Sequence, residues 1–171
     1  MNKHDRIAAF VDALATGGDP AAAAADGDPA RHPCFLGYRR LFDEARYYEA
    51  HDVLEHLWLG ARGDRNFLFY KGLIQLAGAF VHLQKQHAAP AHPKHGRRLR
   101  PAARLFDLAA KNLAPFAPRH LGLDVAALLT LCARTTAALA ADDFQRNPWS
   151  PATAPTLPQA KEPTRHQGAR D

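Results

Sequence analysis

The sequence predicts an all-α fold: a single-domain bundle of about five or six helices with a central antiparallel helix hairpin. Apolar residues recur at helical spacing along most of the chain, and no stretch shows the alternating pattern of a strand. The 171 residues, 47% hydrophobic and 23% charged, fit one ordinary globular domain. Two segments, 47–58 and 71–83, are expected to form the central hairpin.

The chain divides into three parts. Residues 1–33 predict a short amphipathic helix over 5–15, followed by a flexible linker rich in alanine, aspartate and proline. Residues 34–145 contain the helical domain. Residues 146–171 hold five prolines and hardly any large apolar residue after Trp149, so we expect a disordered tail.

Proline, glycine and aspartate mark the helix ends in the first half of the domain. A helix is expected to open near Pro33, which suits a first helical turn, and to run to about Ala45. The next helix carries the 47–58 segment and ends at a glycine-rich turn. The fourth helix begins with Asp64 as its N-cap and runs to about Gln86. Because only a short turn joins these two helices, they should pack antiparallel.

The second half of the domain begins with a loop. Residues 87–97 hold two prolines, a glycine and three histidines, which predict an exposed loop. A fifth helix fits Pro101 in its first turn and ends before Pro115. Asp124 can cap a sixth helix, which reaches as far as Asp142.

Composition also bears on location. The first ten residues include Asp5 and Arg6 without an apolar run behind them, and no uncharged apolar stretch is long enough to cross a bilayer. We therefore expect neither a signal peptide nor a membrane partner. Cys34 and Cys132 are widely separated and outside any ligand spacing, which favours a reduced, cytoplasmic setting.

The two central helices carry polar side chains where packing alone favours apolar ones. In the first, His51 and Glu55 lie one turn apart on the flank of the apolar face. The second is apolar nearly all round, except for one stripe at i, i+4, i+7 and i+11. That stripe consists of Lys71, Gln75, Gly78 and His82. Since buried polar groups need partners, the histidines, Glu55 and Gln75 are expected to meet in one cluster.

These two segments resemble a known family. YYEAHDVLEHLW and KGLIQLAGAFVHL, in this order, are similar to the motifs YfEAHExLExxW and FLqGLIQlAxAxxHL of the family catalogued as domain of unknown function 309. The resemblance covers about residues 36–140 and implies a small all-helical domain with a set of candidate residues, but no reaction. Asp52 stands where the family usually has glutamate, and Lys71 replaces a common glutamine.

The polar cluster has two interpretations. His51 and Glu55 can chelate a divalent metal such as zinc, with His82 as a third ligand and a position open for water. Metal-assisted hydrolysis would then be the first reaction class to test. Alternatively, the cluster is a buried hydrogen-bond network that fixes the register of two helices. The spacing lacks the HExxH or ExxH pattern of well-known metalloenzymes, which favours the structural alternative. Whether the protein is an enzyme stays open.

Three further residues are assigned to the same pocket, which would bind a metal or a small ligand. Gln75 orients the ligand. Tyr48 lies beside Glu55 on the helical wheel and can donate its hydroxyl to the carboxylate. Glu49 belongs to the resembled motif and can pair with Lys71 or Arg46, whereas Asp52 and His56 are expected on a solvated face.

A basic stretch supports the competing function, a non-catalytic interaction module that recruits an acidic or nucleic-acid partner. Five of the residues that give the chain its formal net charge of +5 crowd into eleven positions: Lys94, Arg97, Arg98, Arg100 and Arg104. The stretch has no interleaved aromatic residues, and the chain offers no recognition helix, which argues against nucleic acid. The oligomeric state, including a homo-oligomer, is left open by the sequence.

Overall fold

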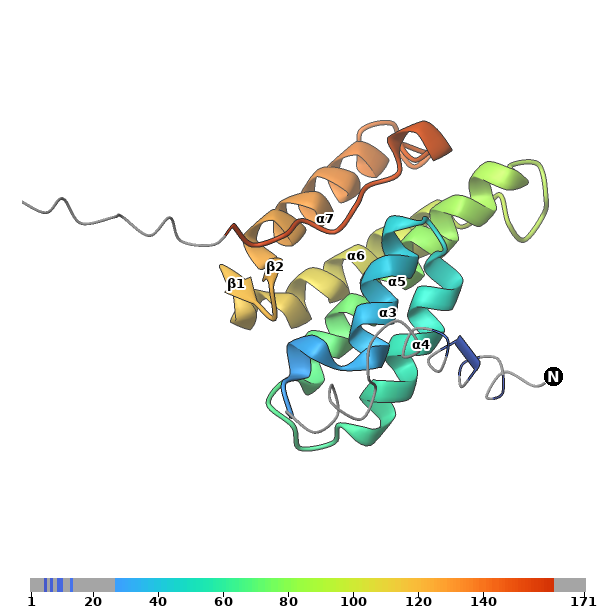
Figure 1. Ribbon diagram of the computed structural model, residues 1–171. Helices are drawn as coiled ribbons and strands as arrows, with labels where there is room; N and C mark the ends of the chain where they lie inside the picture. Colours follow the sequence, from blue (N-terminus) through green and yellow to red (C-terminus); the bar gives the residue numbers. More distant parts are fainter. Residues whose placement is uncertain (1–4, 6, 8, 11–12, 14–26, 162–171) are drawn as a thin grey trace, which may run out of the picture.

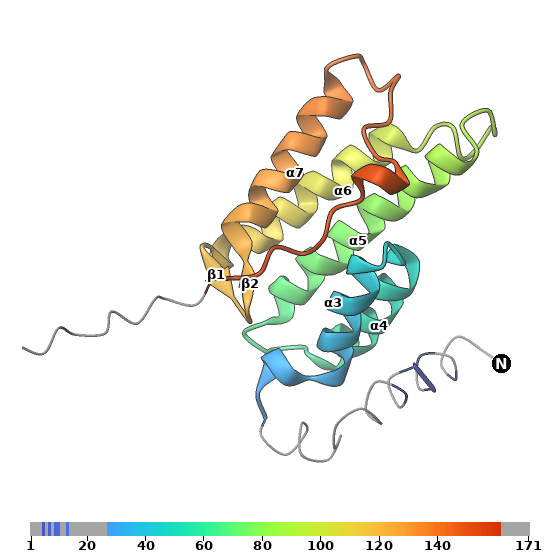
Figure 2. The same cartoon turned by 45° about the horizontal axis from the view of Figure 1, so that its top comes forward.

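The computed structural model describes residues 5, 7, 9, 10, 13 and 27–161. Within these residues the fold is all-α apart from one two-stranded sheet, which confirms the predicted class. The long helices are α3 (Pro33–Asp43), α4 (Tyr47–Gly60), α5 (Phe67–Ala88), α6 (Leu99–Leu113) and α7 (Val125–Ala140). Helix α5 is central: α4 packs on one side of it and α6 on the other, with α3 against α4 and α7 against α6 (Figures 1 and 2).

Most predicted helix boundaries agree with the structure, and one shifts. Pro33 opens α3, and Asp124 caps α7 by accepting a hydrogen bond from the backbone N–H of Ala127 at 2.9 Å. Asp64, expected as the N-cap of α5, lies two residues before the observed N-cap, Asn66. Its carboxylate accepts from the backbone N–H of Asn66 at 2.6 Å, which makes an Asx turn ahead of the helix.

An aromatic cluster forms the centre of the core. Phe80 of α5 lies 5.5 Å from Phe42 of α3, 5.0 Å from Tyr47 of α4 and 5.1 Å from Phe106 of α6, measured between ring centroids. All four side chains are buried. Four helices therefore meet around one phenylalanine, and this contact fixes the position of α5.

The expectation of a disordered tail from residue 146 is wrong for the described part of that segment. Asn147 donates to the carbonyl of Leu83 at 2.8 Å, and Trp149, 6% exposed, donates its indole N–H to the Tyr47 hydroxyl at 3.3 Å. The backbone N–H of Leu157 donates to Asp43 at 2.7 Å. Figure 2 shows this segment running along the helices toward the small sheet. Two buried apolar anchors and a few long-range hydrogen bonds order it despite its prolines.

The small sheet is an antiparallel pair, β1 (Arg119–His120) and β2 (Leu123–Asp124), that the sequence pattern did not predict. Gly122 forms the turn with a φ of 78°, which favours glycine. The carbonyl of Gly122 accepts from the backbone N–H of Ala160, so the C-terminal segment docks on this turn.

The predicted N-terminal helix and linker lie mostly outside the described residues. The five described positions between 5 and 13 are helical, and Ile7 is buried while Phe10 packs partly against the core. The described end of the linker holds a 3-10 turn, Pro29–Arg31. Among the described helices, none combines the length and the apolar character needed to cross a membrane.

Candidate functional site

Three side chains of α4 form a group with the composition of a metal site. The Nδ1 atom of His51 lies 3.1 Å from Oδ1 of Asp52, and one ligand atom each of His51, Asp52 and Glu55 lies within 4.8 Å of the others. The side chain of His51 is 31% exposed, whereas Asp52 is 6% exposed. In the described part of the chain, no other set of three histidine, cysteine or acidic residues is as close.

The burial of Asp52 corrects the expectation of a solvated face. Asp52 lines a pocket of about 300 Å³ together with Ile7 and Phe10 of the N-terminal segment and Val53 of α4. Two apolar side chains of the N-terminal segment therefore lie beside this part of α4. The buried aspartate is also close enough to His51 and Glu55 to belong to the same group.

His51 projects from α4 toward the polar stripe of α5, as expected. A Cβ atom built on Gly78 would lie 3.9 Å from Cδ2 of His51 and 3.5 Å from Cδ1 of Leu105 on α6. Side chains from α4 and α6 therefore meet over Gly78. A methyl group at this position would make ordinary van der Waals contacts with both, so Gly78 marks the place where the two side chains approach α5.

The expected single cluster is not what the structure shows, because Gln75 and His82 have partners elsewhere. Gln75 accepts a hydrogen bond from Asn112 of α6 at 2.7 Å. The Nδ1 atom of His82 lies 3.1 Å from the Arg98 guanidinium, and His82 is outside the group of potential metal ligands. The reason is geometric: Gln75 and His82 lie seven residues apart on α5, about 10 Å along its axis, which is too far for one ion to join both.

Tyr48 and Glu49 lie on the exposed side of α4. The Lys85 ammonium sits 5.5 Å from the centroid of the Tyr48 ring, a cation–π contact between α5 and α4. Glu49 accepts from Arg46 at 3.4 Å, which is one of its two expected partners. Tyr48 and Glu49 line the same pocket as Asp52, so they border the proposed metal group from the side of the N-terminal segment.

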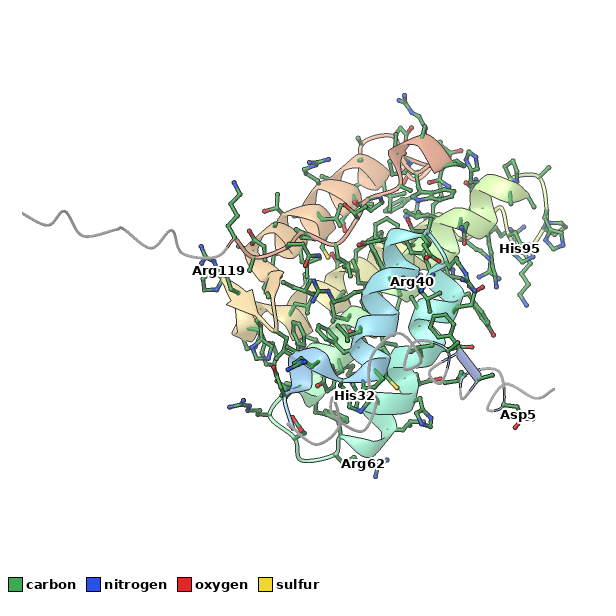
Figure 3. All side chains as sticks on the ribbon, viewed as in Figure 1. Asp5, His32, Arg40, Arg62, His95 and Arg119 are labelled. Atoms are coloured by element: carbon green, nitrogen blue, oxygen red, sulfur yellow. The ribbon has the colours of Figure 1, made fainter. Side chains whose placement is uncertain are left out.

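A second polar centre lies where the loop after α5 enters α6. Arg98 donates from Nε to Nδ1 of His95 at 2.9 Å, and its NH1 faces Nδ1 of His82. The rings of His92 and His95 lie 4.4 Å apart, and Figure 3 places His95 at this end of the molecule. Burial, followed by the charges of Arg98 and Lys85, lowers the pKa of His82 below its usual value.

Arg98, which belongs to this centre, is one of the five basic residues of the stretch, and a second one, Arg100, also has partners. Arg100 donates to Asp143 at 2.6 Å, and its guanidinium lies 4.3 Å from the Phe144 ring centroid. Sequence reasoning missed Asn112 and Arg98 as partners of the α5 stripe. The crowding of arginines just ahead of α6 was a signal for Arg98; nothing in the sequence singled out Asn112.

Comparison with known proteins gives one match. The family model described as "Domain of unknown function (DUF309)" matches residues 35–92, which confirms the resemblance of the two motifs to that family. The matched region contains α4, α5 and all of α3 except its first two residues, and with them His51, Asp52 and Glu55. No curated protein and no solved structure matches the chain.

Proposed function

We propose that this chain, whose residues 35–92 match domain of unknown function 309, binds a divalent metal ion through His51, Asp52 and Glu55. The observation that carries the proposal is the approach of three ligand atoms to within 4.8 Å of one another on a single helix. Asp52 takes the place of His82, which was expected as the third ligand and instead faces Arg98.

The spacing of the group suits a small ion. Metal–ligand bonds of about 2.0–2.2 Å place two ligand atoms of one ion about 3–4.4 Å apart. The 3.1 Å separation of His51 and Asp52 lies in this range, and the Glu55 oxygen lies within 4.8 Å of both. One nitrogen and two carboxylates suit zinc and also manganese or iron.

The arrangement leaves room for chemistry. Three protein ligands leave at least one coordination position for water, and a metal-bound water is a nucleophile at neutral pH. We therefore take metal-assisted hydrolysis as the reaction class to test first. The competing function is structural: the Asp52 carboxylate accepts a hydrogen bond from His51 and fixes its ring against α5.

The setting we propose is the cytoplasm. Both cysteines are free and buried, and burial raises the pKa of Cys34 to about 11 and that of Cys132 to about 12. Neither thiol is therefore reactive at neutral pH, as suits a protein that lives in a reducing compartment.

Calorimetric titration with Zn²⁺ and Mn²⁺, on protein purified without a histidine tag, tests the metal. We expect one saturable site, and at 100 times its Kd the ion adds about 2.7 kcal/mol to the free energy of unfolding. For a domain of this size the melting temperature then rises by about 5–10 °C, and EDTA reverses the rise.

Asp52→Asn and His51→Gln should each abolish this response. Asp107→Asn is the matched control, because it removes an exposed carboxylate of α6 that belongs neither to the metal group nor to the pocket that Asp52 lines. Absence of saturable binding in the wild type, or equal losses in Asp107→Asn and Asp52→Asn, would leave the structural function as the better explanation.

A further inference from the structure

The second polar centre has an unusual composition, because an arginine is held there by two histidines. Arg98 is half-buried, and its polar contacts within the described residues are with Nδ1 of His82 and Nδ1 of His95. Other arginines of the chain pair with carboxylates: Arg40 with Glu44, Arg100 with Asp143 and Arg146 with Asp142.

The hydrogen bonds fix the protons of this centre. A guanidinium only donates, so Nδ1 of each histidine accepts, and each ring is neutral with its proton on Nε2. The pKa of His95 is lowered by partial burial, then by His92 and Arg98, and also by Lys85 and Lys94. The charged groups that act on the two histidines are thus all cationic.

We propose that Arg98, His82 and His95 form a binding site for the phosphate group of a small anionic ligand. A half-buried guanidinium is the side chain best suited to bind phosphate, because its donors form a planar fork that matches two phosphate oxygens. A phosphate supplies the negative charge that the centre lacks. It also stabilises the charged form of each histidine, which the neighbouring cations otherwise disfavour.

A small ligand fits better than a nucleic acid. Arg100, the next basic residue along α6, is occupied by Asp143 and Phe144. Arg98, Lys85 and Lys94, in contrast, all act on the ring of His95, so these cations surround one point instead of following a backbone. Extended tracks of cations with stacking aromatics are the features of single-stranded nucleic-acid sites.

The position of this centre also suggests a substrate class, a step that rests on the proposed metal function. His82 follows Gly78 by one turn of α5, about 6 Å along the axis, and His51 of the metal group lies over Gly78. A phosphorylated small molecule held by Arg98 would therefore extend along the stripe toward the metal. We infer that the substrate is a phosphorylated small molecule whose phosphate would stay on Arg98 while an ester bond at its other end lies beside His51, Asp52 and Glu55. Water would add its oxygen to the acyl carbon of that ester and its proton to the departing alcohol, which gives a carboxylic acid and an alcohol.

NMR of the histidine rings of the full chain, titrated with inorganic phosphate in EDTA, tests the phosphate site without any metal. Sodium chloride at equal ionic strength is the control. We expect saturable shifts at His82 and His95 and a raised pKa for His82, with His32 and His120, elsewhere in the fold, unaffected. Equal shifts with chloride, or no saturation, would overturn the proposal.

Two arginine variants sharpen the test, since each removes one charge at neighbouring positions. Arg98→Gln should weaken phosphate binding at least tenfold, and Arg97→Gln, at an exposed site, less than twofold. Equal losses of phosphate affinity in the two variants would mean a diffuse electrostatic effect and would also overturn the proposed phosphate site. If Arg98→Gln does not fold, the wild-type titration decides. Tighter binding of an oligonucleotide than of phosphate, lost in Arg97→Gln, would replace the small ligand by a nucleic acid.

The two proposals fail separately. Metal binding is measured without phosphate, and phosphate binding is measured in chelator. If the protein binds phosphate but no metal, the phosphate site at Arg98 stands and the inference about the substrate class fails. If it binds metal but no phosphate, only the proposed metal-binding function stands.

Discussion

The two long faces of α5 differ in what covers them. On one face Phe80 and Leu83 are buried beneath α3, the start of α4 and the C-terminal segment. On the opposite face the stripe is half-buried, and two of its polar members, Gln75 and His82, each have a separate partner. Gln75 is matched by α6, and His82 by the residue that precedes α6.

Because of this difference, we expect the apolar face of α5 to contribute mainly to stability and the polar face mainly to ligand binding. An apolar face gains stability from every side chain that leaves water, so its surroundings close over it. A polar face keeps its hydrogen-bonding groups only where each has a partner, and it stays partly open. Changes on the apolar face should therefore lower the free energy of unfolding, whereas changes on the polar face should act mainly on ligands.

The largest effect is expected at Phe80. Phe80→Ala removes a ring that is 2% exposed and packs against three other aromatic rings, so it should lower the free energy of unfolding by about 3–5 kcal/mol. The loss is measured by urea denaturation, with circular dichroism as the probe of unfolding. The control is Leu108→Ala, because Leu108 is an exposed apolar residue of α6. Equal losses in both variants would mean that the two sides of the bundle contribute alike.

Trp149 tests whether the C-terminal segment is part of the apolar face. Trp149→Ala should cost about 3 kcal/mol, since it removes a buried indole and its hydrogen bond to Tyr47. Trp149→Phe keeps an aromatic ring without the N–H and should cost about 1 kcal/mol. The same denaturation experiment applies. If both variants stay within about 0.5 kcal/mol of wild type, the tail is as disordered as its composition suggested.

The same contrast shows what the sequence can predict. The helices follow from local patterns: apolar residues at helical spacing, Pro33 at the start of α3 and Asp124 at the start of α7. The approach of His51 to Glu55 is also local, because i and i+4 are neighbours on any helix. These features need no knowledge of the tertiary structure.

The features that were wrong or missed depend on distant parts of the chain. Gln75 and its partner are 37 residues apart, and His82 and its partner are 16 apart. Asp52, which is buried, shares a pocket with Ile7 and Phe10, more than 40 positions earlier in the sequence. Trp149 gains its burial from residues more than 60 positions earlier. Periodicity within one helix carries no information about such partners, so the pattern predicts the members of the stripe but not their contacts.

The smallest effect concerns pH and the polar face. Because the folded-state pKa of His82 lies below its unfolded value of 6.5, the unfolded chain takes up a proton first as pH falls. Stability is therefore intact above pH 6.5 and decreases as pH falls from 6.5 toward the folded-state pKa. His32, His95 and His120 have lowered pKa values as well and add to this decrease.

His82→Gln removes one of these titrating groups from the polar face and keeps an acceptor for Arg98. Urea denaturation at pH 7.5 and 5.5 should show a smaller loss of stability in the variant. The difference in stability loss between the variant and the wild type should stay below about 1.4 kcal/mol per pH unit, which is the value for one full proton. Phosphate should reduce the loss in the wild type too, because an anion beside Arg98 stabilises the protonated ring. Equal losses in the variant and the wild type would mean that His82 is not held neutral by its neighbours, and the contrast between the two faces of α5 would lose its electrostatic part.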